Sequence, residues 1–222
     1  MSALPSQSRY IIGTEACERF SFYGMKSILM LYMTGHLLMS DNWATSTLHI
    51  FVGMVYLLPL AGAWLADKVW GRYKTILYIS LLYCVGHGVL ATADLFHTIE
   101  ARRYILMAGL FIIALGAGGI KPCVSAFMGD QIPNKSPQLM TKAFNAFYWA
   151  INLGSFFSFL VIPAMEQRYG YSWAFAVPGI FMGIATFAIG LLPTHESVGA
   201  WAAVLLLIMR LAQGFALGGE WS

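Results

Sequence analysis

The chain has 222 residues, of which 59% are hydrophobic and only 10% are charged. Because a soluble globular domain carries about 25% charged residues, this composition indicates an integral membrane protein. The net charge of +3 is small and the basic residues are scattered, which argues against a nucleic-acid-binding surface. Cys17, Cys84 and Cys123 lie in separate apolar segments without metal-site or disulfide spacing, so we interpret them as buried thiols.

Seven apolar segments are long enough to cross a hydrocarbon core about 30 Å thick, which needs about 20 residues. Because the backbone in lipid must satisfy its own hydrogen bonds, and no alternating strand pattern is seen, these segments are predicted to be helices. They cover residues 11–38, 47–66, 74–94, 104–127, 144–165, 172–192 and 198–218. The predicted fold class is therefore an all-α membrane protein.

The distribution of lysine and arginine among the loops favours a cytoplasmic N-terminus. With this orientation the cytoplasmic side holds twice as many basic loop residues as the outer side. The inner set is Arg9, Lys68, Arg72, Lys74, Lys135 and Lys142, and the outer set is Arg102, Arg103 and Arg168. We expect a multi-pass protein of the plasma (inner) membrane.

The first span carries charges that lipid does not tolerate, namely Glu15, Glu18, Arg19 and Lys26. Each unpaired charge at the centre of a span costs about 2.5 to 3.5 kcal/mol. With the helical turn of about 100° per residue, the polar side chains of residues 15–26 fall within an arc of about 140°. We expect this polar face to point into the bundle interior or into an aqueous cavity.

The spacing of these charges suggests how they pair. Glu15 and Arg19 are four residues apart and can touch along the helix, whereas Glu18 and Arg19 are adjacent and are not expected to face each other. Glu18 is therefore expected to need a cation from another span, and Lys121 in "GAGGIKPCVSAFMGD" is that candidate. A static salt bridge between the two spans and a protonatable switch both remain open.

Four segments follow one another along the chain: "EACERFSFYGM", "LHIFVGMVYLLPLAGAWLADKVWGRYKTI", "GAGGIKPCVSAFMGDQ" and "FNAFYWAINLGSFFS". The first resembles the ExxERFxYYG motif of the proton-dependent oligopeptide transporters (POT/PTR), a branch of the major facilitator superfamily. The others resemble that family's second helix with its following loop, its fourth helix and its fifth helix. The resemblance covers about residues 9–188.

The resemblance implies a fold and a function. The fold is the six-helix N-terminal half of a twelve-helix transporter, expected over residues 1–192, with an extra transmembrane helix over residues 193–222. The function is proton-coupled symport of di- and tripeptides, with the proton as coupling ion, no cofactor, no metal and no enzymatic activity. The missing C-terminal half would be a required partner, along with peptide, protons and the bilayer, so we expect the chain to be inactive alone.

The resemblance also implies roles for individual residues. Those for proton coupling are Glu15, Glu18, Arg19, His49 and Lys121; those for peptide binding are Tyr23, Lys26, Tyr56, Lys121 and Asn152; those of a gating loop are Gly62, Asp67, Gly71 and Arg72. Simple positive-inside anchoring is the alternative for the loop, and an interior hydrogen-bonded histidine is the alternative for His49. Phe22 and Lys26 replace a tyrosine and an arginine of the family motif, which leaves the side-chain preference open.

The chain changes character after residue 188. The segment "LLPTHESVGAWAAVLLLIMRLAQGFALGGEWS" resembles the fourth helix of the metabolite–proton symporters, through Arg210 to Gly214 and the following "GGEW". A fourth-helix motif in a seventh-helix position suggests a chimera, with a divergent linker helix as the alternative. The alternative functions are accordingly a non-transporting truncated or chimeric membrane protein, or a proton-coupled metabolite symporter.

Overall fold

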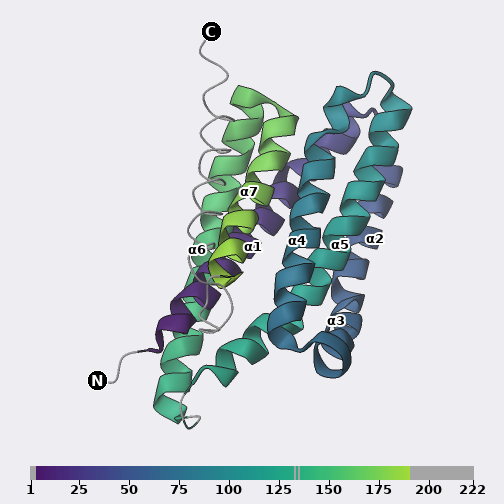
Figure 1. The fold of residues 1–222 in the computed structure, drawn as a ribbon. Helices are drawn as coiled ribbons and strands as arrows, with labels where there is room; N and C mark the ends of the chain where they lie inside the picture. Colours follow the sequence, from purple (N-terminus) through teal and green to yellow (C-terminus); the bar gives the residue numbers. More distant parts are fainter. Residues whose placement is uncertain (1–3, 133, 135, 191–222) are drawn as a thin grey trace, which may run out of the picture.

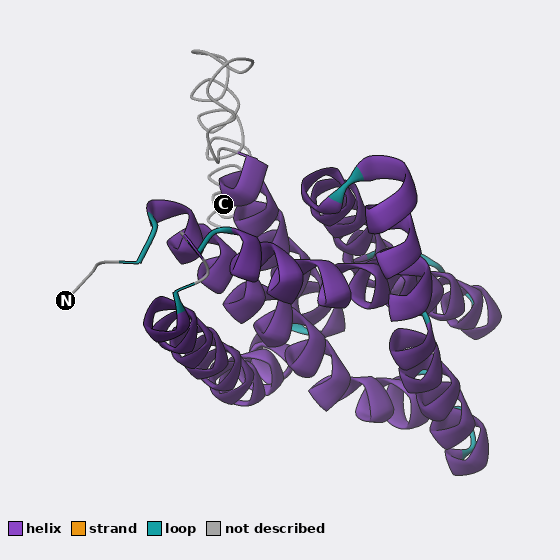
Figure 2. Ribbon diagram, turned by 90° about the horizontal axis from the view of Figure 1, so that it is seen from below, coloured by secondary structure: helices purple, strands orange, loops and turns teal. Residues whose placement is uncertain are grey.

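The computed structural model describes residues 4–132, 134 and 136–190. Long helices joined by short connections make up this part of the chain, as Figures 1 and 2 show. In chain order the elements are α1 (Ser6–Leu31), η1 (Tyr32–His36), α2 (Asp41–Leu57), α3 (Pro59–Leu65), η2 (Ala66–Trp70), α4 (Arg72–Ala91), η3 (Ala93–Leu95), α5 (Ile99–Asp130), α6 (Pro137–Tyr169) and α7 (Tyr171–Gly190). The all-α prediction is confirmed.

These elements form six rods that match the first six predicted spans. The first rod is α1 continued by the π-helical turn η1, and the second is α2, α3 and the π-helical turn η2. Five rods are long and apolar enough to cross a membrane, and α1 is the exception because of its charged residues. The predicted seventh span, 198–218, and the proposed extra helix over 193–222 lie outside the described residues.

Local sequence signals set the helix ends. The side chains of Ser40 and Thr98 accept hydrogen bonds from the backbone N–H groups of Trp43 and Ala101, so they cap α2 and α5. Gly71, with φ at +77°, follows η2 and reverses the chain into α4. The second predicted span ends at residue 66, whereas helical structure continues through η2 to Trp70.

The rods associate in two groups that meet in the middle of the bundle. One group consists of α1, α6 and α7, and the other of α2, α3, α4 and α5 (Figure 1). The most extensive contacts within them are α1 with α6 and α4 with α5. Packing of α4 against α7, and of α1 against α5, joins the groups. The charged face of α1 is thereby directed into the protein, as its polar arc predicts.

Small residues allow the backbones of α3 and α5 to touch. A Cβ atom added to Gly62 would lie 2.5 Å from the Cα of Gly119 and 2.6 Å from its carbonyl oxygen. Backbone atoms cannot move aside as the end of a flexible side chain can. Gly62 therefore permits close packing of α3 against the glycine run that precedes Lys121.

Gly62→Ala is expected to lower the stability of the bundle by about 1–3 kcal/mol, because the added methyl group forces α3 and α5 apart. The measurement is thermal unfolding of the purified chain in detergent. Gly53→Ala is the matched control, since nothing lies within 4 Å of its added Cβ. That change should be neutral or stabilising through helix propensity. Equal unfolding temperatures for the two variants would contradict the packing argument.

Candidate functional site

The centre of the candidate site is a buried cluster of three charges on α1. The exposed fractions of Glu15, Glu18 and Arg19 are 6%, 1% and 8%. Arg19 Nε lies 3.0 Å from Glu15 Oε1, and Arg19 Nη2 lies 2.5 Å from Glu18 Oε2. One guanidinium therefore bridges both carboxylates.

This geometry corrects the expectation that Glu18 and Arg19 would not face each other. Adjacent positions point about 100° apart on a helix, but that angle describes the Cα–Cβ bonds. The arginine side chain is long enough to return its planar guanidinium to the helix surface, where two nitrogens reach two different carboxylates. Glu18 thus has a cation within its own helix and does not depend on a direct ion pair from another span.

Lys121 approaches this cluster from α5 without forming an ion pair within the described residues. Its Nζ lies 5.1 Å from the ring centroid of Phe22 and 5.0 Å from that of Tyr56, so two aromatic faces hold the ammonium. It remains in electrostatic range of Glu15 and Glu18. The expected contact between the first and fourth rods is confirmed, with the lysine half-buried beside the cluster rather than bonded to it.

Phe22 has a role that its motif position did not reveal. The sequence presents it as the loss of one tyrosine hydroxyl. The structure shows a buried ring that faces Lys121 on α5 and stacks on Phe51 of α2, with centroids 6.0 Å apart. Phe22 therefore connects three rods and provides an apolar, electron-rich surface for the ammonium.

The residues predicted to bind peptide lie in several places around this cluster. Tyr23 and Lys26 are half-buried on α1, and Lys26 is in electrostatic range of Lys121. Tyr56 on α2 is 74% exposed. Asn152 lies on α6, where it donates to the carbonyl of Tyr148 at 2.8 Å. Three cationic side chains, those of Arg19, Lys26 and Lys121, thus gather on the inner side of α1 and α5.

An open hollow of about 380 Å³ extends along α6. Its lining residues are Asn145, Tyr148, Trp149 and Asn152. Tyr148 and Trp149 are 60% and 70% exposed, so aromatic surface and amide groups alternate on this face. Such a combination suits a ligand that has both backbone amides and variable side chains.

His49 is not brought into the charged cluster. It is exposed on α2, and within the described part of the chain it makes no hydrogen bond or ion pair. Its role in proton binding stays a prediction. His87 on α4 is fully buried, and its Nδ1 lies 3.2 Å from the carbonyl oxygen of Phe175. It joins α4 to α7.

The predicted gating loop contains an ion pair across two rods. Arg72 Nη1 at the start of α4 lies 2.5 Å from Asp130 Oδ2 at the end of α5. Both side chains are about two-fifths exposed, so the pair contributes little to stability but holds the connection in one position. Asp67 is exposed nearby. Asp130 lies in the segment "GAGGIKPCVSAFMGDQ", whose sequence does not predict this ion pair.

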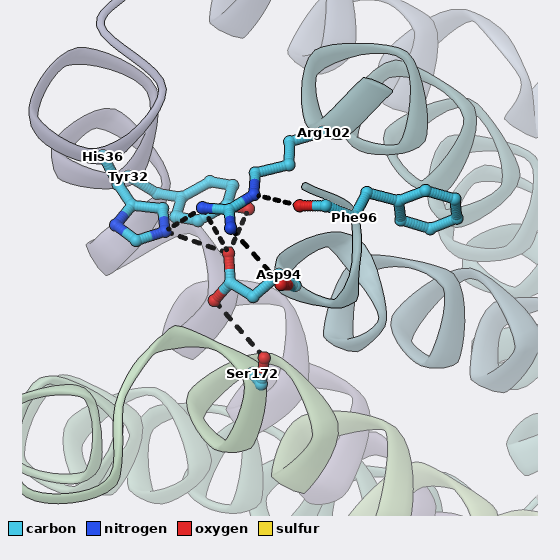
Figure 3. Close-up of polar contacts among 6 residues, drawn as sticks. All are labelled: Tyr32, His36, Asp94, Phe96, Arg102 and Ser172. Atoms are coloured by element: carbon cyan, nitrogen blue, oxygen red, sulfur yellow. Dashed lines mark hydrogen bonds and ion pairs between the residues drawn. The ribbon is translucent and has the colours of Figure 1, made fainter. Parts of the chain in front are cut away.

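The sequence analysis also missed a polar cluster around Asp94, at the ends of α1 and α4. Its members are Tyr32, His36, Asp94, Arg102 and Ser172 (Figure 3). From the segment "DLFHTIEARR", the sequence analysis names only Arg102 and Arg103, as basic residues on the outer side. The available signal was the concentration of ionisable residues in one short outer connection.

Comparison with known proteins gives a consistent result. A family model described as "POT family" matches residues 73–191. Human "Solute carrier family 15 member 2" is 41% identical over 199 residues, which cover 85% of this chain and 27% of that protein. "Peptide transporter 3" of Caenorhabditis elegans is 39% identical over 233 residues, covering 97% of this chain and 33% of that protein.

A solved structure is similar over a larger share of its own chain. The in meso crystal structure of the POT family transporter PepTSo has a TM-score of 0.77 and 40% identity, covering 97% of this chain and 48% of the other. The chain thus spans about half of that transporter and about a third or less of the curated relatives. Because the C. elegans alignment continues beyond residue 188, the hypothesis of a chimeric tail finds no support here.

Proposed function

The chain belongs to the POT family, and from this premise we propose that it supplies the N-terminal half of a proton-coupled symporter of di- and tripeptides. The observation that carries the proposal is the buried Glu15–Arg19–Glu18 cluster with Lys121 beside it. Its charges balance when both carboxylates are ionised and both basic groups are protonated. A change at one carboxylate therefore changes what the cluster can bind.

Charge balance couples proton and peptide. If Glu18 takes up a proton, the cluster gains one unit of positive charge in a site of low dielectric, where uncompensated charge is unfavourable. The terminal carboxylate of a peptide restores neutrality at Lys121. Oε1 of Glu18 has no hydrogen-bond partner among the described residues, so this oxygen is available for the proton. Proton and peptide thus stabilise each other's binding, and this reciprocity is the basis of symport.

The remaining groups fit a peptide as ligand. Lys26 and Lys121 provide positive charge for the carboxylate end, and the face of α6 with Asn152 provides amide and aromatic surface for the middle. The amino end requires an anionic group, which we assign to the second half of the transporter. The proton is the coupling ion, and no other cofactor is needed for this scheme.

We further propose that the protein lies in the plasma (inner) membrane with its N-terminus inside the cell. The start of α1, the start of α4 and the end of α5 lie at one end of the bundle (Figure 1). The larger set of basic loop residues belongs to these segments and to the residues next to them in the chain. The positive-inside rule places that end in the cytoplasm.

The test joins residues 1–190 to the C-terminal half of a related POT transporter and reconstitutes the protein in proteoliposomes. An inward proton gradient is expected to drive accumulation of labelled dipeptide. The 222-residue chain reconstituted alone should show none, because alternating access needs two halves that rock about a central site. Accumulation by the chain alone would contradict this prediction and indicate a working homodimer.

The joined protein also allows the site to be tested. Lys121→Gln should reduce uptake at low peptide concentration, because the carboxylate loses its partner. Lys142→Gln is the matched control, since Lys142 is exposed at the start of α6. A joined protein that inserts and folds but moves no dipeptide under any gradient would favour the non-transporting alternative.

A further inference from the structure

Asp94 contacts side chains from three other rods, at the end of the bundle opposite the start of α1. It belongs to η3, and its Oδ1 accepts a hydrogen bond from Tyr32 Oη at 3.1 Å. Ser172 Oγ of α7 donates to Oδ2 at 3.3 Å, and Arg102 Nη1 of α5 lies 3.8 Å from Oδ1. His36 Nε2, at the end of η1, is 3.0 Å from the same Oδ1 (Figure 3).

The contacts of His36 Nε2 conflict with each other. This nitrogen lies 3.0 Å from Asp94 Oδ1 and 3.2 Å from Arg102 Nη1. A carboxylate only accepts hydrogen bonds and a guanidinium only donates them. One ring nitrogen cannot donate to Asp94 and accept from Arg102 at the same time. Whether Nε2 carries a proton therefore decides which of the two bonds exists.

We propose that this cluster is a proton-binding site, separate from the Glu15–Arg19–Glu18 cluster, and that His36 is its proton acceptor. Without the proton on Nε2, the imidazole accepts a hydrogen bond from Arg102 and attaches the end of α1 to α5. With the proton, Nε2 donates to Asp94 and the end of α1 is held by η3. Proton uptake thus moves one hydrogen bond of His36 from Arg102 of α5 to Asp94 of η3.

Two other hydrogen bonds hold Arg102 in place when its bond to His36 is lost. Its Nε donates to the carbonyl of Phe96 at 2.7 Å, and its Nη2 donates to the backbone carbonyl of Asp94 at 3.4 Å. Only Nη1 faces His36, so loss of the bond to His36 leaves the hydrogen bonds of Nε and Nη2 intact. Repulsion between imidazolium and guanidinium is limited because both cations share the carboxylate of Asp94.

Other groups around His36 keep the ring in position. Tyr32 stacks on it with centroids 5.2 Å apart, and Tyr171 of α7 lies 5.1 Å away. Tyr171 also interacts with Glu166 of α6. On α5, Arg103 donates to the carbonyls of Leu37 and Leu38, and fixes the turn that follows His36. Asp94 and Arg102 are therefore the charged groups in direct contact with the imidazole.

His36 is more exposed than the carboxylates of the Glu15–Arg19–Glu18 cluster. The side chain of His36 is 35% exposed, whereas that of Glu18 is 1% exposed. Histidine is the side chain whose ordinary titration falls between pH 5 and 8. Both sites lie on the same rod, α1 with η1. A role of the His36 proton in peptide transport rests on the proposed function. Proton binding by the Asp94 cluster does not depend on that function.

The test is ¹⁵N NMR of the full chain in lipid nanodiscs, labelled at its five histidines. The signals of His36 are assigned as those that are absent from the spectrum of His36→Asn. At pH 8 its Nε2 should be unprotonated and hydrogen-bonded as an acceptor, and at pH 5 it should carry a proton. A protonated Nε2 at pH 8, or an unchanged Nε2 between the two pH values, would overturn the proposal. This measurement needs no substitution of Asp94 or Arg102.

Two variants then separate this site from an ordinary surface histidine. Asp94→Asn should move the His36 titration midpoint to lower pH by about one unit, because the carboxylate that stabilises the cation is gone. Arg102→Gln should move it to higher pH by a similar amount, because the repelling cation is gone. His97→Gln is the control, an exposed histidine in the same connection that should leave the midpoint unchanged. Midpoints unaffected by both partner variants would refute the proposal.

Discussion

Arg19→Met is expected to prevent stable folding of the chain, because it leaves Glu15 and Glu18 buried without their shared cation. Removal of one partner from a buried ion pair costs about 3–5 kcal/mol, and here a single change breaks two contacts. Domains have a total stability of about 5–15 kcal/mol, so a loss of this size removes a large part of the stability. The measurement is the yield of monodisperse protein and its unfolding temperature in detergent.

A triple variant distinguishes charge from packing in this prediction. Arg19→Met combined with Glu15→Gln and Glu18→Gln removes the uncompensated charges and keeps similar volumes, so it should recover most of the stability. Arg9→Met is the control, because Arg9 is exposed near the start of the same helix. If the single variant is as stable as the parent, the buried cluster does not exist in the folded protein. If the triple variant is no better than the single one, packing and not charge explains the loss.

Glu18→Gln in the joined transporter is expected to abolish accumulation of dipeptide against its gradient. An amide cannot gain and lose a proton, so peptide binding no longer depends on proton uptake. The protein should still exchange labelled for unlabelled peptide across the membrane, because Lys121 and the face of α6 are unchanged. The measurements are gradient-driven uptake and counterflow in the same proteoliposomes, with the accumulation ratio expected to fall to one.

The comparison of the two assays makes the interpretation specific. Loss of both activities would indicate a damaged site, whereas loss of accumulation alone indicates lost coupling. Glu100→Gln is the matched control, an exposed glutamate in the first turn of α5 that should support full accumulation. Accumulation by Glu18→Gln equal to that of the parent would show that the coupling proton binds elsewhere.

Much of the architecture could be predicted from the sequence because local rules govern it. The lengths of the apolar segments predict six rods that the structure contains, since a backbone in lipid has no partner for its polar groups except itself. Helical periodicity predicts the inward face of α1, and the order of four motifs indicates the family. These properties depend on residues close together in the chain.

The contacts that define the site were decided only by tertiary structure. The attachment of Arg19 to both glutamates depends on the conformation of a long side chain, which the direction of its Cα–Cβ bond does not determine. The position of Lys121 between Phe22 and Tyr56 depends on the relative rotation and height of three rods. The Asp94 cluster joins residues that are 62, 58 and 78 positions away in the chain. Sequence patterns specify which face of each helix is polar, but the meeting of particular atoms depends on how the close-packed helices fit together, and no single helix contains that information.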